Sequence, residues 1–256
     1  MTSSTPTTAP PPADNGLVTI QPGVLTVGTE SVTAPWYTAT DSSDPTTING
    51  GFEYDLARSI AARLGLSSVR IVVTPLVDVL SAQACACDVM FDEILVTDNR
   101  ARRADFTEPY LTVDQGVLVR KGTTLSTVVE GRQLRWGVAL ENASGLDLLT
   151  KRIKPNVAPQ VVVDQQDALA RLEDGRLDAV LLPTPDALAR AEVDTSVTVA
   201  GQLRTSDLYA GVLALGSPNT ALLNDAIRDM RDDGTIALFL RHYFGVDPSD
   251  VPVIPS

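Results

Sequence analysis

The sequence predicts an α/β protein built as two lobes, each with a parallel-rich β-sheet flanked by helices. Short β-rich runs alternate with helical patterns, and residues 161–163, 168–172 and 177–182 read as a strand–helix–strand unit. Two β-rich runs, residues 115–120 and 208–215, lie where the chain would pass from one lobe to the other and back. Two crossing strands predict a hinge, and the space between the lobes is the expected ligand site.

Composition excludes several classes of partner. The 256 residues carry a formal net charge of −12, so phosphate backbones and anionic membrane surfaces are poor partners and no nucleic acid is expected. No apolar run of about eighteen residues is present, so no membrane span is expected. No apolar segment follows Met1, which predicts that a signal sequence is absent from this chain.

The first residues differ in composition from the rest of the chain. Residues 1–16 consist mainly of Ser, Thr, Pro and Ala and contain almost no large apolar side chain, so they are expected to form a disordered tether. A cytoplasmic protein with a flexible tail is the alternative that the sequence leaves open.

The two cysteines, Cys85 and Cys87, do not predict a metal site. A zinc ion needs three or four ligands, and the single histidine, His242, lies far away in a helical pattern that indicates packing. We expect two free or locally paired thiols in a loop; a Cys-x-Cys disulfide, which closes a small strained ring, is the less favoured alternative.

The expected elements of the first lobe begin with a strand at residues 25–29. A loop through 30–37, a helix at 52–64, a strand at 69–73 and a short helix at 77–82 follow. The long helix has apolar residues at every fourth position, and Gly65 is placed to end it.

Residues 88–110 are the stretch around which the rest of the chain is organised. Two apolar runs, 89–91 and 94–96, are interrupted by Asp92 and Glu93, and because an unpaired buried carboxylate is costly, these side chains are expected to face a cleft. Thr97 is placed to cap a short helical turn that carries Arg100. A guanidinium beside free backbone N–H groups predicts a site for a small carboxylate.

The second half of the chain repeats the alternation. A strand at 136–139, a helix starting at 142–145, a helix at 184–191, a strand at 197–200 and terminal helices at 222–230 and 235–243 are expected. Residues 17–112 and 209–256 are assigned to lobe 1 and residues 113–208 to lobe 2.

Four segments in this order resemble one known family. They are Thr97 and Arg100 followed by DFTEPY (105–110), GFEYDLARSIAARLGL (51–66), GRLDAVLL (175–182) and MRDDGTIALFLRHYFG (230–245). The chain resembles family 3 of the extracellular solute-binding proteins, the polar amino-acid receptors of ABC importers. The resemblance implies the type II periplasmic-binding-protein fold, in which hinge closure captures a small polar ligand.

The resemblance also implies a biological setting. The expected protein is a monomeric, extracytoplasmic receptor that is lipid-anchored in its native form, uses no cofactor or metal, and delivers its ligand to a membrane permease. A receptor that senses its ligand without transport is a close variant.

On the lobe 1 side, the resemblance implies four ligand-facing positions and one hinge position. Arg100 would clamp a ligand carboxylate, with a surface ion pair to a neighbouring carboxylate as the alternative. Glu30 would bind a cationic group of the ligand; the alternative is that it is an exposed loop glutamate. Trp36 or Tyr37 would stack on the ligand, although either could be a core residue. Tyr110 corresponds to a hinge tyrosine of the family.

On the lobe 2 side, Asn142, Ala143 and Ser144 occupy positions where the family offers backbone N–H groups and hydroxyls to a carboxylate. A plain helix cap at Ser144 is the alternative.

Three positions depart from the usual family pattern for amino acids. Glu93 and Leu95 replace small or hydroxylated residues, and Pro183 replaces the aspartate that binds the ligand ammonium. Proline offers neither charge nor an N–H donor. Asp186, one turn further on, or the pair Asp92 and Glu93 would have to supply the negative charge. The sequence therefore favours a cationic or amine-rich ligand over an ordinary free α-amino acid.

An enzymatic alternative uses the same fold. Cyclohexadienyl dehydratases resemble these receptors and use an acidic general acid, for which Glu93 is the candidate if burial raises its pKa. The sequence contains no Ser-His-Asp set and no phosphate-binding glycine loop. Binding is the leading hypothesis, and no catalytic residue is assigned.

Overall fold

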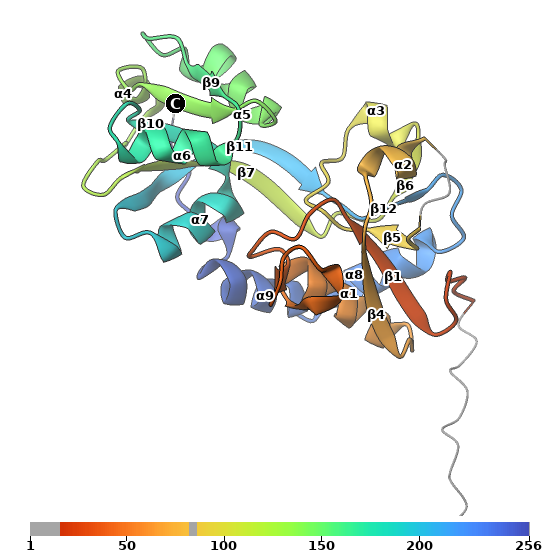
Figure 1. Cartoon of the computed structure of the whole chain (residues 1–256). Helices are drawn as coiled ribbons and strands as arrows, with labels where there is room; N and C mark the ends of the chain where they lie inside the picture. The colour runs from red at the N-terminus through yellow and green to blue at the C-terminus, as the bar shows by residue number, and fades with distance from the viewer. Residues whose placement is uncertain (1–15, 82–85, 256) are drawn as a thin grey trace, which may run out of the picture.

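The computed structural model describes residues 16–81 and 86–255, which form two lobes joined by a pair of long strands (Figure 1). The sheet of lobe 1 has the order β4-β1-β5-β12-β6 and that of lobe 2 the order β11-β7-β10-β8-β9. The lobe 1 strands are β1 (Val24–Thr29), β4 (Ser68–Val73), β5 (Val89–Met90), β6 (Ala104–Phe106) and β12 (Val212–Ala214). The lobe 2 strands are β7 (Leu111–Arg120), β8 (Trp136–Ala139), β9 (Gln160–Val162), β10 (Ala179–Pro183) and β11 (Val197–Tyr209). Most of residues 1–16, the expected tether, lies outside the described residues.

Both sheets are mixed: each contains parallel pairs, as predicted, together with antiparallel pairs. In lobe 1, β1 pairs in parallel with β4 and β5, whereas β12 runs antiparallel to β5 and β6. In lobe 2, β8 pairs in parallel with β9 and β10, whereas β7 runs antiparallel to β10 and β11. The strand–helix–strand units form the parallel pairs. Strands β12 and β7 run antiparallel to their neighbours, because the chain enters each of these two strands at a crossing between the lobes. A small third sheet pairs β2 (Thr38–Ala39) with β3 (Ile48–Gly50).

The helices of lobe 1 follow the predicted apolar spacing. Helix α1 (Phe52–Arg63) buries Phe52, Leu56 and Ile60 on one face, as the four-residue spacing indicated. Its N-cap is Gly51, at φ 115°, where a Cβ would lie 2.2 Å from the carbonyl oxygen of Trp36. A side chain at this position would displace the loop that carries Trp36, so glycine fixes where that indole lies.

The remaining helices cover the sheets. Lobe 1 also has α2 (Leu76–Leu80), α3 (Asp98–Ala101), α8 (Thr220–Asp232), α9 (Thr235–Phe244) and the 3-10 turn η1 (Pro45–Thr47). Lobe 2 has α4 (Val128–Gly131), α5 (Ala143–Asp147), the π-helical η2 (Leu148–Ile153), α6 (Gln165–Glu173) and α7 (Thr184–Val193). No helix of residues 16–81 and 86–255 combines the length and apolarity that a membrane crossing requires.

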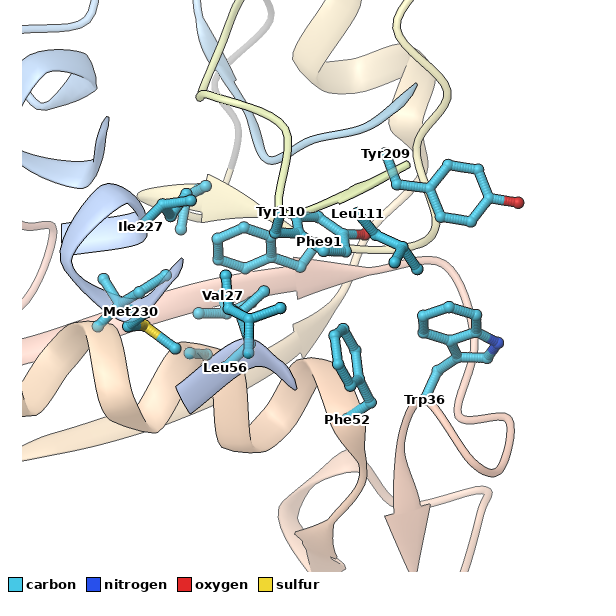
Figure 2. Close-up of a cluster of buried hydrophobic side chains, with 14 of the residues drawn as sticks. Val27, Trp36, Phe52, Leu56, Phe91, Tyr110, Leu111, Tyr209, Ile227 and Met230 are labelled. Carbon is cyan, nitrogen blue, oxygen red and sulfur yellow. The ribbon is translucent and has the colours of Figure 1, made fainter. Parts of the chain in front are cut away.

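Two hydrophobic cores flank the sheet of lobe 2. Along β7, Val117 and Val119 belong to one cluster and Leu118 to the other, as alternation across a sheet requires. Lobe 1 has a larger aromatic cluster, in which Trp36 packs edge-on against Phe52 at a centroid distance of 5.6 Å (Figure 2). Tyr209, which ends β11, contacts Trp36 at 6.1 Å. The lobe 1 core therefore extends to the point where the lobes meet.

The crossing between the lobes is an antiparallel ribbon of β7 and β11. Its register runs from Leu111 opposite Tyr209 to Arg120 opposite Val197, with irregularities on the β11 side. The expected return crossing at residues 208–215 is displaced, because the crossing strand ends at Tyr209 and residues 212–214 already belong to the lobe 1 sheet.

The C-terminal segment connects the lobes a third time. After α9 and the turn η3 (Pro248–Asp250), Gln202 of lobe 2 donates a side-chain hydrogen bond to the carbonyl oxygen of Val251, at 2.7 Å. Ile254 is 3% exposed and packs in a lobe 2 core. The final described residues thus lie on lobe 2, whereas residues 209–256 were expected to lie wholly in lobe 1. The physical reason is that burying the side chain of Ile254 in a lobe 2 core stabilises this placement.

Replacing Ile254 tests this connection. We expect Ile254→Ala to lower the free energy of unfolding by about 2–5 kcal/mol, because it leaves a cavity in a lobe 2 core. The neighbouring Val253, which is 36% exposed, provides the control, and Val253→Ala should change stability by about 0.5 kcal/mol or less. Urea unfolding of both variants gives the comparison, and equal effects would contradict the packing role of Ile254.

Candidate functional site

A cavity of about 500 Å³ lies between the lobes, and both lobes line it. Lobe 1 contributes Glu30, residues 92–95 and Arg100, and lobe 2 contributes Gln115, residues 141–144, Pro183 and Asp186. Six carboxylates line the cavity, those of Glu30, Asp92, Glu93, Glu141, Asp186 and Asp207, and Arg100 is the single lysine or arginine among the lining residues. A second cavity of about 650 Å³ shares Glu93, Glu141, Gln165 and Asp186 with the first.

Arg100 reaches the cavity from the short helix α3. Thr97 caps this helix by accepting a hydrogen bond from the Arg100 backbone N–H, and Nη1 of Arg100 donates to the carbonyl oxygen of Leu95 at 2.9 Å. Among the described residues, no carboxylate lies within ion-pair distance of the half-buried Arg100 guanidinium. The guanidinium therefore has donors left over and, within the described part of the chain, no counterion.

Two neighbouring carboxylates that were candidates for a surface ion pair with Arg100, Glu108 and Asp105, bind other groups. Glu108 binds Arg228 at 2.7 Å and Arg231 at 3.2 Å. Asp105 accepts hydrogen bonds from the backbone of Ser217 and the hydroxyl of Thr220.

Glu30 and Asp92 have partners in lobe 1. Oε1 of the exposed Glu30 accepts a hydrogen bond from the backbone of Leu76 at 2.8 Å, at the start of α2, while Glu30 also lines the cavity. Asp92 accepts from the hydroxyl of Thr29 at 2.5 Å, and burial raises its pKa above the ordinary value. Asp92 thus faces the ligand space with one oxygen already engaged.

Glu93 and Asp186 face the same cavities from opposite lobes. Burial, followed by repulsion from Asp186, Glu53 and Asp92, raises the pKa of Glu93 well above its usual range. Burial also raises the pKa of Asp186 to about 6, although a hydrogen bond from Nε1 of Trp36, at 2.9 Å, opposes the shift. Burial therefore favours the neutral, protonated form of both carboxyl groups.

Glu53 is a functional candidate that sequence reasoning missed. It is 0% exposed, and its Oε1 accepts hydrogen bonds from the backbone N–H of Glu93, at 2.7 Å, and from the hydroxyl of Tyr110. Its Oε2 has no hydrogen-bond partner in the described part of the chain. Burial raises the pKa of Glu53 to about 8. An acidic residue in the first turn of a helix is common, because its negative charge interacts favourably with the helix dipole. No local pattern therefore indicated that Glu53 is buried.

The two aromatic candidates, Trp36 and Tyr37, lie in different environments. Tyr37 is 1% exposed, donates to the carbonyl oxygen of Phe91 and lines neither cavity, so the core alternative describes it. Trp36 is also buried, but its indole N–H reaches Asp186 in lobe 2 and it lines the second cavity. Trp36 therefore connects the lobes and does not line the first cavity.

Asn142 organises the lobe 2 side of the cavity. Its Oδ1 accepts from the backbone of Gly145 at 2.9 Å and its Nδ2 donates to Gln115 at 2.7 Å. Asn142 is therefore the helix cap, a role that the sequence had offered as an alternative for Ser144. Ala143 and Ser144 also line the cavity, and Gln115, which is 2% exposed, is a lining residue that the sequence did not indicate.

The positions that depart from the family pattern lie in the cavity as well. Pro183 ends β10 and lines the space without a donor, and Asp186 faces the same space from the first turn of α7. Leu95 lines the cavity and forms an isolated bridge to Tyr209. Tyr110 lies just before β7, where its backbone donates to Tyr209 and its hydroxyl to Glu53.

The cysteines and the histidine lie outside this site. Cys87 is in a disulfide, which corrects the preference for thiols, and Cys85 lies outside the described residues. His242 packs against Tyr243 on α9 with ring centroids 4.6 Å apart. Within residues 16–81 and 86–255, no group of His, Cys, Asp or Glu side chains has the arrangement of a metal site.

Comparison with known proteins agrees with this geometry. The sequence pattern of the bacterial extracellular solute-binding proteins, family 3, matches residues 25–246. The L-cystine-binding protein TcyJ of Escherichia coli (strain K12) is 29% identical over 254 residues, or 92% of this chain and 88% of that protein.

Solved structures share the fold. An ancestral cationic amino acid solute-binding protein superposes with a TM-score of 0.73 at 23% identity, over 87% of this chain and 96% of that one. An ancestral arginine-binding protein bound to arginine gives a TM-score of 0.64 at 26% identity, over 87% of this chain and 99% of that one. The predicted two-lobed periplasmic-binding-protein fold is confirmed.

Glu53→Gln tests the buried carboxyl group, because glutamine keeps an acceptor for both donors but does not titrate. The folded pKa of Glu53, about 8, lies above the ordinary value of 4.5, so folding favours the protonated form. Its stabilising contribution is present below the unfolded pKa and is lost as pH rises towards 8. Between pH 5 and pH 8 the wild type should lose on the order of a few kcal/mol more unfolding free energy than the variant. Urea unfolding at both pH values measures this difference, and parallel pH profiles would show that Glu53 is ionised in the folded protein.

Proposed function

The chain belongs to family 3 of the bacterial extracellular solute-binding proteins, and from this premise we propose that it captures a small amino-acid-like ligand between its lobes. The ligand carries a carboxylate at one end and a cationic group at the other, and the protein presents it to the permease of an ABC importer. The observation that carries the proposal is the uncompensated guanidinium of Arg100 in a cavity lined by six carboxylates.

The ligand carboxylate binds Arg100 in this proposal. Because Nη1 of Arg100 is held by the carbonyl oxygen of Leu95, the guanidinium is oriented before the ligand arrives. Charge-assisted hydrogen bonds to a carboxylate are stronger than neutral ones, and a planar guanidinium can form two in parallel.

The cationic end of the ligand lies near Glu93 and Asp186. Pro183 cannot bind an ammonium group, and Asp186 supplies a carboxylate from the same end of α7. A cation between Glu93 and Asp186 relieves their mutual repulsion, which an uncharged ligand would leave in place. The L-cystine-binding relative and the arginine-binding structure bind amino acids with additional polar groups, which supports this ligand class.

Ligand binding favours closure because the two ends of the site belong to different lobes. Arg100 is on lobe 1, and Asn142 and Asp186 are on lobe 2. A ligand stabilises the closed form only to the extent that it binds that form better. The proposal places the protein outside the cytoplasm as a monomer, with a lipid anchor in its native setting.

The dehydratase alternative is favoured by one observation, the raised pKa of Glu93 in the cavity. A protonated carboxyl group beside a ligand could act as a general acid. Turnover of prephenate or arogenate by the purified protein decides between the two functions: turnover supports the enzyme, and ligand binding without turnover supports the receptor or the sensor.

Arg100→Ala tests the carboxylate site, with L-arginine and agmatine as paired probes that differ in the carboxylate group. We expect the affinity for L-arginine, measured by titration calorimetry, to fall about 10–100-fold while agmatine is little affected, because only L-arginine loses a charge-assisted partner. Arg102, an exposed neighbour, supplies the control variant Arg102→Ala. A thermal-shift screen of amino acids, amines and small acids extends the test, and any carboxylate-bearing compound that binds Arg100→Ala unchanged would contradict the assignment.

A second prediction concerns the cationic end and uses L-arginine with L-citrulline, its uncharged analogue of nearly the same shape. The wild type should prefer L-arginine by about 10-fold or more, since a hydrogen bond to a charged group is worth roughly 1.5–3 kcal/mol. The double variant Glu93→Gln/Asp186→Asn should bind both probes with similar affinity. Retained discrimination in the double variant would place the cation elsewhere.

A further inference from the structure

Glu53 is the buried titratable group that neither end of the proposed ligand contacts. It lies in the first turn of α1, is completely buried and lines neither cavity. Its position between the cleft and the crossing ribbon nevertheless sets it apart from the surface carboxylates of α1.

One oxygen of Glu53 connects the cleft to the hinge. Oε1 accepts from the backbone N–H of Glu93, a cavity residue in the left-handed region at φ 53°. The same oxygen accepts from the hydroxyl of Tyr110, whose backbone N–H donates to Tyr209 at 3.0 Å where β7 and β11 begin to pair. A continuous chain of bonded groups therefore runs from the cavity through Glu53 to the strands that cross between the lobes.

The charges that face Glu53 are all of one sign. Asp92 and Glu93 face it from the loop after β5 and Asp186 from α7, and the neutral hydroxyls of Tyr37, Tyr110 and Tyr209 complete its titratable surroundings. Among the described residues, none of these carboxylates forms an ion pair with lysine or arginine. A positive charge in the cavity is thus the one change that would ease ionisation of Glu53 without altering the fold.

We propose that Glu53 is a positioning residue that responds to a cation in the cleft and transmits its presence to the hinge through Tyr110. The proposal rests on the proposed function, because the ligand supplies the cation. With the cavity empty, Glu53 is neutral and holds Glu93 and Tyr110 through ordinary hydrogen bonds. With a cation bound, Glu53 releases its proton, and its bonds to both donors become charge-assisted and therefore stronger.

The sign of the pH effect follows from linkage. A cation lowers the pKa of a nearby carboxyl group, so binding releases a proton from Glu53 at pH values below its pKa in the empty protein. Affinity for a cationic ligand consequently rises as pH approaches about 8 from below. A residue that merely supported the fold would show no such proton release.

The first experiment measures the protons released on binding L-arginine at pH 7.5, by calorimetry in two buffers of different ionisation enthalpy. L-arginine suits this purpose because its guanidinium stays charged throughout the range. E53Q should release fewer protons than the wild type, by up to about one. The surface variant Asp229→Asn on α8 is the control and should match the wild type. Equal release by E53Q and the wild type overturns the proposal.

The second experiment needs no ligand. A double-mutant cycle of E53Q and Tyr110→Phe measures the coupling between the two side chains from urea unfolding at pH 6.5 and pH 9. Expressed as a ratio of unfolding constants, the coupling should be about 3–10-fold larger at pH 9, where Glu53 is ionised. Coupling of equal size at both pH values overturns the proposal. If no compound binds but the coupling still grows with pH, the proposed ligand class fails, while the charge-dependent link between Glu53 and Tyr110 stands.

Discussion

The antiparallel pairing of β7 with β11 is the interaction on which the rest of the molecule depends. These two strands are shared by both lobes, and the residues along them serve each lobe in turn: Leu111 and Tyr209 pack in the lobe 1 core, Gln115 lines the cavity, and Leu118 packs in lobe 2. The ribbon is interrupted on the β11 side, where Oδ1 of the buried Asp114 accepts hydrogen bonds from the backbone of residues 205 and 206. Asp114 therefore pairs backbone groups that the interrupted strand ladder leaves without a partner in β7.

The cavity beside this ribbon brings several carboxylates together, an arrangement that is electrostatically unfavourable. Buried carboxylates repel one another and lose hydration, which raises the pKa of Glu93. The hydroxyl of Thr29 donates to Asp92 and the indole of Trp36 donates to Asp186, and no lysine or arginine of the described residues forms an ion pair with these carboxylates. Such an arrangement costs stability in the empty protein. The same arrangement makes the site selective for cations, because a positive ligand group relieves the repulsion between the carboxylates and a neutral group does not.

Much of the fold follows from local patterns, whereas long-range burial does not. The four-residue apolar spacing of α1 and the cap at Thr97 are short-range signals, and both elements form as predicted. Arg100 lies in the cavity because its helix follows shortly after the loop that carries Asp92 and Glu93, which itself follows β5. The roles of Glu53 and Ile254 were missed because they depend on segments distant in sequence. Tyr110 donates a hydrogen bond to Glu53, and Ile254 packs in a core of lobe 2. The mixed sheets likewise depend on how the chain returns between lobes, which no local pattern specifies.

The third connection gives the two ends of the described chain different anchoring points (Figure 1). Near the beginning, the backbone of Val18 bonds to Asn219 of lobe 1, whereas the backbone of Val128 in lobe 2 donates to the carbonyl oxygen of Pro255. Any movement of one lobe against the other must then change the separation of the chain ends. A pair of fluorescent proteins fused to the termini would convert that movement into an optical signal, so the architecture is suited to a biosensor without insertion of a reporter into either lobe.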